Sequence, residues 1–260
     1  MNSATVLART SPVRVSSSRK PVDLLTRYNS YFHTRRAENQ NSLRAAQAVR
    51  YQVYCLERKF EDQAEHQSGH ESDAFDTHAV HSLIFHRPTS EAIGTTRLIL
   101  RLTGTALPIE GLLAEQGIRA DDHFPLETAA EVSRFAISNS FRRGVEDVTE
   151  ARGRECRSSM PCLGLIQELL QQSVTLGLTH WTAVMEPKLL RMLAAMGIHF
   201  TPVGPIVSHH GLRQPSYCRL STMLERLKRE RPENWMVVTD AGRLAVAESE
   251  GQMTAQHRAA

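Results

Sequence analysis

Paired cysteines are missing from this chain of 260 residues. The four cysteines are scattered, and none belongs to a CxxC pair: Cys55, Cys156, Cys162 and Cys218. This pattern argues against a disulfide framework and against a zinc knuckle. It favours a protein of a reducing cytoplasm.

Long apolar runs and a strong net charge are also missing. No uninterrupted apolar stretch approaches the roughly 18 residues that a membrane-spanning helix needs. The formal net charge of +3 is too small to indicate a nucleic-acid partner. Lysine is scarce, because only four of the 31 basic residues are lysines. Arginine suits the recognition of carboxylates and phosphates, although codon composition is a simpler explanation of the bias.

Composition divides the chain into three segments. Residues 1–20 are rich in arginine and serine, contain no acid and could not form a core, so they predict a disordered basic tail rather than a transit peptide. Residues 21–235 carry the periodic apolar pattern of a single folded domain. Residues 236–260 are expected to form a C-terminal tail.

The first half of the domain predicts one helix and a strand hairpin. Apolar residues recur at steps of three and four over 42–57, which predicts an amphipathic helix with Ser42 as its cap. An acidic, histidine-rich stretch at 58–77 reads as a long loop, and long loops in compact domains are often functional. The hairpin strands are expected at 78–87 and 91–102.

The second half alternates between helices and strands. A strand at 131–138 is followed by a polar connection at 139–160 and by a helix at 161–177 with Pro161 near its start. We then expect a strand at 180–185 and a helix at 186–197. Strands at 198–207 and 215–221 and a surface helix at 222–235 complete the order. This order predicts a single α/β (α+β) domain with a mixed sheet.

Charged residues interrupt the apolar strand EVSRFAIS at 131–138. Strict alternation places Arg134 on the same face as Val132, and Glu131 on the opposite face with Ile137. Burying an unpaired charge is expensive, so the strand is either an exposed edge or an interior strand whose charges serve a purpose. Arg97 lies in another apolar strand, and the loop before it supplies a group of carboxylates. Together these charges favour an interior strand that lines a reaction cleft.

Four motifs in fixed order carry a resemblance to a known family. They are RYQVYCLE, ESDAFD, GTTRLIL and EVSRFAI. This order resembles the acyl-homoserine-lactone (autoinducer) synthases and the long-chain N-acyl amino acid synthases. Residues 185–218 resemble in particular the acyltransferases associated with bacterial PEP-CTERM/exosortase systems. The resemblance covers roughly residues 43–220 and implies a GNAT-like acyltransferase fold, with a mostly antiparallel central sheet flanked by helices.

The resemblance assigns roles to residues of the four motifs. It implies a catalytic set of Arg97, Glu131, Ser133 and Arg134, and a substrate-binding set of Arg50, Tyr54, Phe60, Glu71, Asp73 and Asp76. Amide formation requires a neutral amine, so a base has to remove a proton; Glu131, acting through water, is the candidate. Backbone N–H groups at a bulge in the 131–138 strand would stabilise the oxyanion. The two arginines would keep the carboxylates ionised and oriented.

Two departures from the family pattern bear on the substrates. Homoserine-lactone synthases place a tryptophan where this chain has Phe60, which makes S-adenosylmethionine an unexpected substrate. The segment FRRGVE lacks the second glycine of a GNAT pyrophosphate loop, so the donor is either acyl carrier protein or acyl-coenzyme A. Arg142, Arg143 and Gly144 are the expected donor-binding residues, and acyl carrier protein is the expected partner.

The leading interpretation is a cytoplasmic bacterial N-acyltransferase that uses a small amine acceptor and holds no permanent cofactor. Its lipid product would suit a membrane surface. The alternatives are an acyl-homoserine-lactone synthase that uses S-adenosylmethionine and a non-catalytic module that binds an acyl ligand. No metal is expected, since the histidines near the acidic loop show no recognised ligand spacing: His66, His70, His78, His81 and His86.

Overall fold

The computed structural model describes residues 23–139, 141, 154–208 and 211–245. The helices and strands of the first half are α1 (Leu24–Tyr31), β1 (Phe32–Arg36), α2 (Gln40–Arg50), β2 (Ala79–His86), β3 (Glu91–Leu100), α3 (Pro108–Ala114) and β4 (Ala129–Ile137). Those of the second half are α5 (Arg154–Leu176), β5 (His180–Met185), α6 (Pro187–Ala195), β6 (Thr201–Pro202), β7 (Val207–Ser208), β8 (Leu212–Arg219), α7 (Leu220–Glu230) and α8 (Pro232–Val238). A π-helical segment, η1 (Tyr51–Glu57), continues α2, and short 3₁₀ turns lie at Gln63–His66, Ala74–His78, Ala120–Asp122 and Leu126–Thr128.

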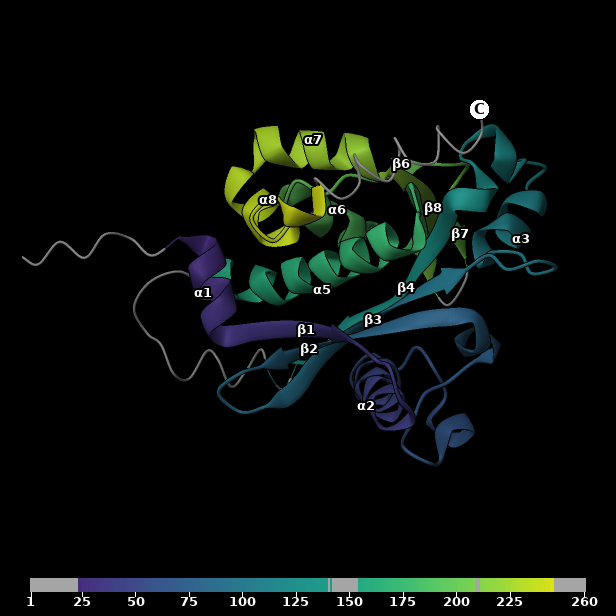
Figure 1. The fold of residues 1–260 in the computed structure, drawn as a ribbon. Coiled ribbons are helices and arrows are strands. Elements are labelled where there is room, and N and C mark those ends of the chain that lie inside the picture. The colour runs from purple at the N-terminus through teal and green to yellow at the C-terminus, as the bar shows by residue number, and fades with distance from the viewer. Residues whose placement is uncertain (1–22, 140, 142–153, 209–210, 246–260) are drawn as a thin grey trace, which may run out of the picture.

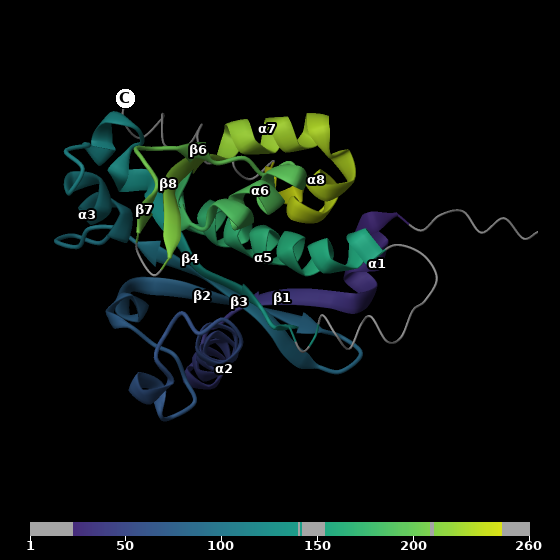
Figure 2. The same ribbon diagram turned by 180° about the vertical axis from the view of Figure 1, so that it is seen from behind.

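One sheet organises the domain, in the strand order β1-β2-β3-β4-β5-β8-β6, with β7 paired to β8. Every strand pair is antiparallel except β4 and β5, which are parallel. Helix α5 lies across one face of the sheet with α7 and α8 beyond it, and α2 covers the opposite face (Figures 1 and 2). The predicted mixed, mostly antiparallel sheet flanked by helices is confirmed.

The main core lies between the sheet and α5. Trp181 of β5 is fully buried there, and its indole N–H donates to Ser173 Oγ of α5 at 2.8 Å. Helices α7 and α8 close this core, since Leu224, Leu227 and Val238 belong to the same apolar cluster. A smaller cluster under β2 fixes α2 on the other face. Apolar burial on both faces therefore holds the sheet as a rigid central layer.

Strands β4 and β5 separate soon after they begin. Their parallel pairing covers only Ala129–Glu131 of β4 against His180–Thr182 of β5. Beyond these residues neither strand pairs with the other along the remaining length of β4. The sheet therefore splits between β4 and β5.

A bulge interrupts β4 at Arg134. Thr95 and Arg97 of β3 pair with Ala136 and Ser133, so two residues of β4 oppose the single intervening residue of β3. Arg134 has a φ of 50°, a left-handed conformation that is uncommon outside glycine. Gly94 of β3 makes the close approach possible, because a Cβ there would lie 2.8 Å from the carbonyl oxygen of Ala136. The bulge expected in this strand is present.

The bulge changes which face each side chain of β4 occupies, and it corrects the expectation from strict alternation. Val132, before the bulge, and Ile137, after it, both enter the core under α5. Arg134 lies on the opposite face with Ser133, because it pairs with Asp73, which also pairs with Arg97. One extra residue shifts the period of two by one position.

Several predicted boundaries are wrong. Helix α2 begins earlier than residue 42: Asn39 is its N-cap, and Ser42 is the third helical residue of a capping box. Pro161 lies inside α5 rather than near its start, because the buried apolar side chains that follow hold the helix against the sheet despite the lost backbone donor. The expected strand at 198–207 is reduced to β6 and β7.

The C-terminal boundary is also corrected. The single helix expected at 222–235 is two helices, because Pro232 begins α8 after a break at Arg231. Val237, Val238 and Leu244 are buried in the main core. The packed domain therefore extends beyond residue 235, into the stretch expected to be a tail.

Candidate active site

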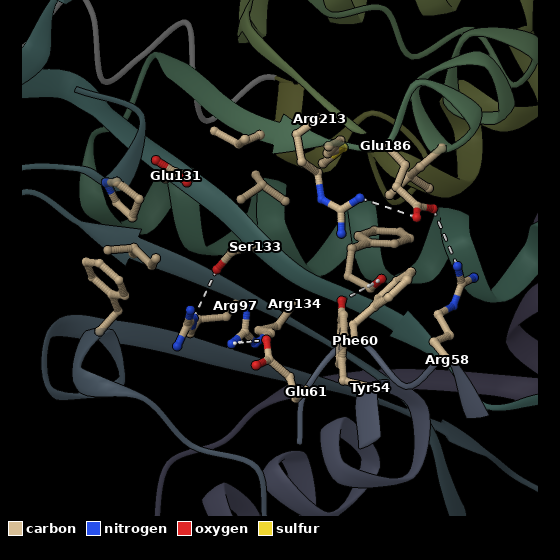
Figure 3. Close-up of a pocket in the computed structure, with 18 of the residues that line it drawn as sticks. Tyr54, Arg58, Phe60, Glu61, Arg97, Glu131, Ser133, Arg134, Glu186 and Arg213 are labelled. Carbon is tan, nitrogen blue, oxygen red and sulfur yellow. Dashed lines mark hydrogen bonds and ion pairs between the residues drawn. The ribbon is translucent and has the colours of Figure 1, made fainter. Parts of the chain in front are cut away.

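A cavity of about 640 Å³ occupies the split between β4 and β5. Part of its lining is apolar and comes from β4, α5, β5 and α6: Phe135, Ile137, Cys162, Met185, Leu189 and Met192. Another part is charged and includes Glu61, Asp73, Arg97, Glu131 and Arg134 (Figure 3). The cavity therefore joins an apolar surface to a set of ionisable groups, a combination typical of a small-molecule site.

Arg50, the last residue of α2, anchors the acidic loop to that helix. Its side chain is fully buried and donates to Glu71 and to Asp76, in the latter case at 2.7 Å. Glu71 is also buried, and its backbone N–H donates to the carbonyl of Gln47 in α2. A buried charge is stable only when it is paired, and here each charge has a partner.

Arg97 connects the acidic loop to the sheet. It is 2% exposed, donates to both carboxylate oxygens of Asp73 and to Asp76, and donates through Nε to Ser133 Oγ at 3.0 Å. A guanidinium that makes a bidentate contact fixes the orientation of its carboxylate as well as its charge. The strand arginine and the loop carboxylates predicted from the sequence are thus brought together.

Two carboxylates of this network, Glu71 and Asp76, remain ionised. Burial alone would raise the pKa of Glu71, but hydrogen bonds from Arg50 and Arg134 outweigh it and lower the pKa to about 2. Burial would likewise raise the pKa of Asp76, and the charges and hydrogen bonds of Arg50 and Arg97 lower it to about 2. The arginines therefore hold Glu71 and Asp76 in their charged form.

Arg134 extends the network into the cavity from the bulge. It donates to Glu71 at 2.9 Å and to Glu61 at 3.2 Å, and its guanidinium lies 5.4 Å from the ring centroid of Tyr54. The Tyr54 hydroxyl faces the carbonyl oxygen of Phe135 at 3.4 Å, on the other side of the bulge. The π-helical segment η1 thus places an aromatic ring directly against the irregular part of β4.

Glu131 differs from the other carboxylates of the cavity. It is 4% exposed and accepts a hydrogen bond from the backbone N–H of Ile109 at 2.7 Å, and none of its contacts in the described chain is an ion pair. Burial raises the pKa of Glu131 to about 7, and the Ile109 N–H and the charge of Arg97 offset this only in part. A carboxyl with a pKa near neutrality can exchange a proton at physiological pH.

A second charged group lines the cavity and was not singled out from the sequence. Glu186 follows β5 and pairs with Arg213 of β8 at 3.3 Å and with Arg58 at 3.5 Å. Phe60 lies beside both arginines (Figure 3). We call Arg58, Phe60, Glu186 and Arg213 the rim cluster. Phe60 was expected to bind substrate, but Glu186 and Arg213 are distant in the chain from Arg58 and Phe60, so no local pattern could have revealed the cluster.

The remaining sequence-predicted residues fall outside this description. Arg142, Arg143 and Gly144 lie outside the described residues.

Among the described residues, no group of three or more histidine, cysteine or acidic side chains is placed to hold a metal ion. His81 is buried beside Asp76, and burial lowers its pKa to about 4. No described helix is both long enough and apolar enough to cross a membrane.

Comparison with known proteins supports the class of the enzyme. Residues 49–149 match the family model described as "Acetyltransferase (GNAT) domain". This stretch includes η1, the acidic loop, the hairpin and β4. Residues 49–149 therefore carry a GNAT-type acyltransferase domain. A search of curated protein sequences gives no match.

Solved structures share the fold at low sequence identity. The CoA-dependent acyl-homoserine lactone synthase BjaI, solved with MTA, has a TM-score of 0.54 at 16% identity over 86% of this chain and 99% of its own. The AHL synthase LasI has a TM-score of 0.51 at 18% identity over 72% and 88%. FeeM, an N-acyl amino acid synthase from uncultured soil microbes, has a TM-score of 0.51 at 15% identity over 75% and 94%. These likenesses establish the fold alone.

Proposed function

We propose that this chain is an N-acyltransferase that moves a fatty acyl group from a thioester donor to the amine of an amino acid or a similar acceptor. The observation that carries the proposal is the cavity between β4 and β5, which joins an apolar lining to carboxyl and guanidinium side chains. An acyl chain is stabilised by the apolar part, and an ammonium group by the carboxylates. FeeM, one of the similar folds, is described as an N-acyl amino acid synthase.

The reaction forms one C–N bond and breaks one C–S bond. The acceptor nitrogen has to lose a proton at or before its attack on the thioester carbonyl, and Glu131 is the proposed base, acting through a water molecule. Its pKa of about 7 suits this role, because the carboxylate form is populated at neutral pH while its conjugate acid can still give a proton away. That proton leaves with the departing thiolate, and the products are an amide and a free thiol.

The bulge supplies the proposed site for the tetrahedral oxyanion. The extra residue of β4 interrupts the regular ladder between β3 and β4 next to the cavity, so backbone N–H groups there are free to turn toward a ligand. Preorganised N–H donors of this kind stabilise the negative charge that develops on the carbonyl oxygen. Arg97 and Arg134, which the loop carboxylates hold in place, have a positioning role in this scheme.

The motif resemblance favours a narrower setting. Residues 185–218 resemble the acyltransferases of bacterial PEP-CTERM/exosortase systems, which supports a cytoplasmic bacterial enzyme with acyl carrier protein as donor. Acyl-coenzyme A is the alternative donor; the similar fold of BjaI is described as CoA-dependent.

The test is an assay of the purified chain with long-chain acyl carrier protein or acyl-coenzyme A and a mixture of L-amino acids. We expect an N-acyl amino acid, detected by mass spectrometry, and one free thiol for each amide formed. Release of thiol without amide would contradict the proposal. Release of methylthioadenosine when S-adenosylmethionine is the acceptor would replace it with lactone synthesis.

A further inference from the structure

In the rim cluster, two arginines pair with a single carboxylate. Glu186 contacts Arg213 through one oxygen and Arg58 through the other, at 3.3 and 3.5 Å. Both distances exceed those of a close charge-assisted hydrogen bond. The pairing therefore compensates only part of the positive charge at this end of the cavity.

Arg213 has N–H donors that no described residue accepts. Its side chain is only 12% exposed, yet both of its polar contacts use Nη1: one to Glu186 and one to the carbonyl of Leu212 at 3.2 Å. Nε and Nη2 have no hydrogen-bond partner among the described residues. By contrast, Arg97 uses Nε, Nη1 and Nη2, each on a protein acceptor. A largely buried arginine with unused donors in a cavity is suited to bind an anion.

Phe60 orients the two guanidinium groups. The guanidinium carbons of Arg58 and Arg213 lie 5.8 and 5.2 Å from the centroid of its ring. Contact with the ring uses the flat face of a guanidinium and leaves the N–H donors at its edge available. Figure 3 shows Glu186 between Arg213 and Arg58, with dashed lines to both.

The rim of the cavity and the charged network beside its inner part carry opposite net charge. At the rim, three cationic side chains (Arg58, Lys188 and Arg213) accompany one carboxylate, that of Glu186. In the inner network, four carboxylates (Glu61, Glu71, Asp73 and Asp76) accompany three guanidinium groups, those of Arg50, Arg97 and Arg134. A ligand that carries both an amino group and a carboxylate complements this polarity.

We propose that Arg213, assisted by Arg58, binds the carboxylate of the acceptor and so selects amino acids over simple amines. This inference rests on the proposed N-acyl transfer. When the acceptor binds, its carboxylate replaces part of the contact that Glu186 makes with the two arginines. The amine of the acceptor then faces the inner network and Glu131. The planar guanidinium can hold a carboxylate in a bidentate arrangement, which a lysine at the same position could not reproduce.

The experiment compares Arg213→Gln and Arg213→Lys with the parent chain on an amino acid acceptor and on its carboxamide, at saturating acyl donor. Because charge-assisted hydrogen bonds are strong, we expect the KM for the amino acid to rise by about tenfold or more in both variants, with kcat much less affected. The KM for the carboxamide should stay within about twofold. Arg226→Gln serves as the control, since Arg226 also pairs with one carboxylate, Glu230, but does not line the cavity.

Three outcomes would overturn the inference. The KM for the donor could rise instead, which would assign Arg213 to the phosphate of the donor's pantetheine arm. The amino acid and its carboxamide could be affected equally. The parent could prefer simple amines, in which case the inference fails while N-acyl transfer stands.

A binding measurement separates this inference from the proposed function. If the parent chain acylates no amine, the proposed function fails, and calorimetric titration of the same amino acid and carboxamide into the parent and into Arg213→Gln decides the inference alone. Binding of the amino acid that weakens by about tenfold in the variant supports it, by the same charge-assisted contact. Equal or absent binding in both proteins overturns it.

Discussion

Arg97 and Ser133 face each other across β3 and β4, with Arg97 Nε donating to Ser133 Oγ at 3.0 Å. They form the last regular pair of the ladder before the bulge at Arg134. The contact joins the charged network of the acidic loop to the strand that carries Glu131. This hydroxyl group is therefore one of the contacts, with those of Arg134, that hold the proposed oxyanion site in place.

Ser133→Ala tests that contact. The substitution leaves the buried Nε of Arg97 without its acceptor, and an unsatisfied buried donor costs about 1–3 kcal/mol. We expect a corresponding loss in the free energy of unfolding, measured by urea denaturation, together with a lower kcat. Ser30→Ala, on the exposed face of α1, is the control. Parent-like values of both quantities in Ser133→Ala would show that the contact matters to neither.

Glu131→Gln should reduce acyl transfer by at least about tenfold, within the usual range for loss of a general base. The amide oxygen can still accept the N–H of Ile109, so the fold is retained. In the parent, the rate should rise with pH through a limb near the Glu131 pKa of about 7, and the variant should lack this limb. A pH–rate profile of both proteins decides. An unchanged rate in the variant would remove Glu131 from the mechanism.

The same substitution should change the pH dependence of stability. Because burial raises the pKa of Glu131 from 4.5 to about 7, the folded state favours the protonated carboxyl. Its stabilising contribution is complete below pH 4.5 and is lost as the pH rises through 7. Glu131→Gln removes this loss. We expect urea midpoints of the parent to fall relative to those of the variant between pH 5 and pH 8; parallel curves would contradict the raised pKa.

Glu71→Gln should destabilise the fold strongly. It leaves the buried guanidiniums of Arg50 and Arg134 with one carboxylate fewer, and removing one partner of a buried ion pair costs up to roughly 3–5 kcal/mol. The pKa of Glu71 is lowered from 4.5 to about 2, so its contribution is present above pH 4.5 and is lost as the pH falls through 2. Denaturation between pH 2 and pH 6 should show this loss in the parent only. Glu127→Gln, at a carboxylate that is 87% exposed, is the control and should remain within about 0.5 kcal/mol of the parent.

S-adenosylmethionine should bind poorly to the parent chain. Its sulfonium group is a cation, and the guanidinium groups of Arg58 and Arg213 lie beside the Phe60 ring and disfavour a further positive charge. Calorimetric titration should give no saturable binding, and no methylthioadenosine should be released in the presence of an acyl thioester. Phe60→Trp, which restores the family's residue, should not create the activity, since the arginines remain.

The donor is tested by Arg142→Ala combined with Arg143→Ala. These residues directly follow Phe141, and a pair of positive charges would attract the phosphate and the acidic surface of acyl carrier protein. We expect a higher KM for acyl carrier protein and a weaker dependence of that KM on salt concentration. A KM that stays constant, or acyl-coenzyme A as the better donor of the parent, would reject the carrier-protein assignment.

The sequence predicted the site better where residues are close together in the chain. Glu131 and Arg134 stood out because each is charged within an apolar strand, and the acidic loop was visible from its composition. The alternation pattern could not locate the bulge, however. Its left-handed residue is an arginine and not a glycine, so the residue type does not reveal the conformation. The faces assigned to Ile137 and Arg134 were therefore wrong.

The rim cluster could not be predicted for a different reason. Arg213 lies in β8 next to Gln214 and Pro215, and Glu186 stands before the proline that begins α6, so each looks like an ordinary surface charge. Only the pairing of β5 with β8 brings them together, because Met185 and Gln214 are opposed in that register. The length of α5 was underestimated because Pro161 resembles a helix start.

The extra residue of β4 also determines which changes in length the chain can accept. Deleting Arg134 would restore a regular ladder with Ile137 still opposite Gly94, but it would remove the bulge and the contacts of Arg134 with Glu61 and Glu71. Length changes in β4 should therefore be far more damaging than substitutions at its surface-facing positions, whereas the turn at residues 87–90 has no such constraint. Natural or engineered variants of this enzyme should keep the number of residues between Glu131 and Ile137 fixed.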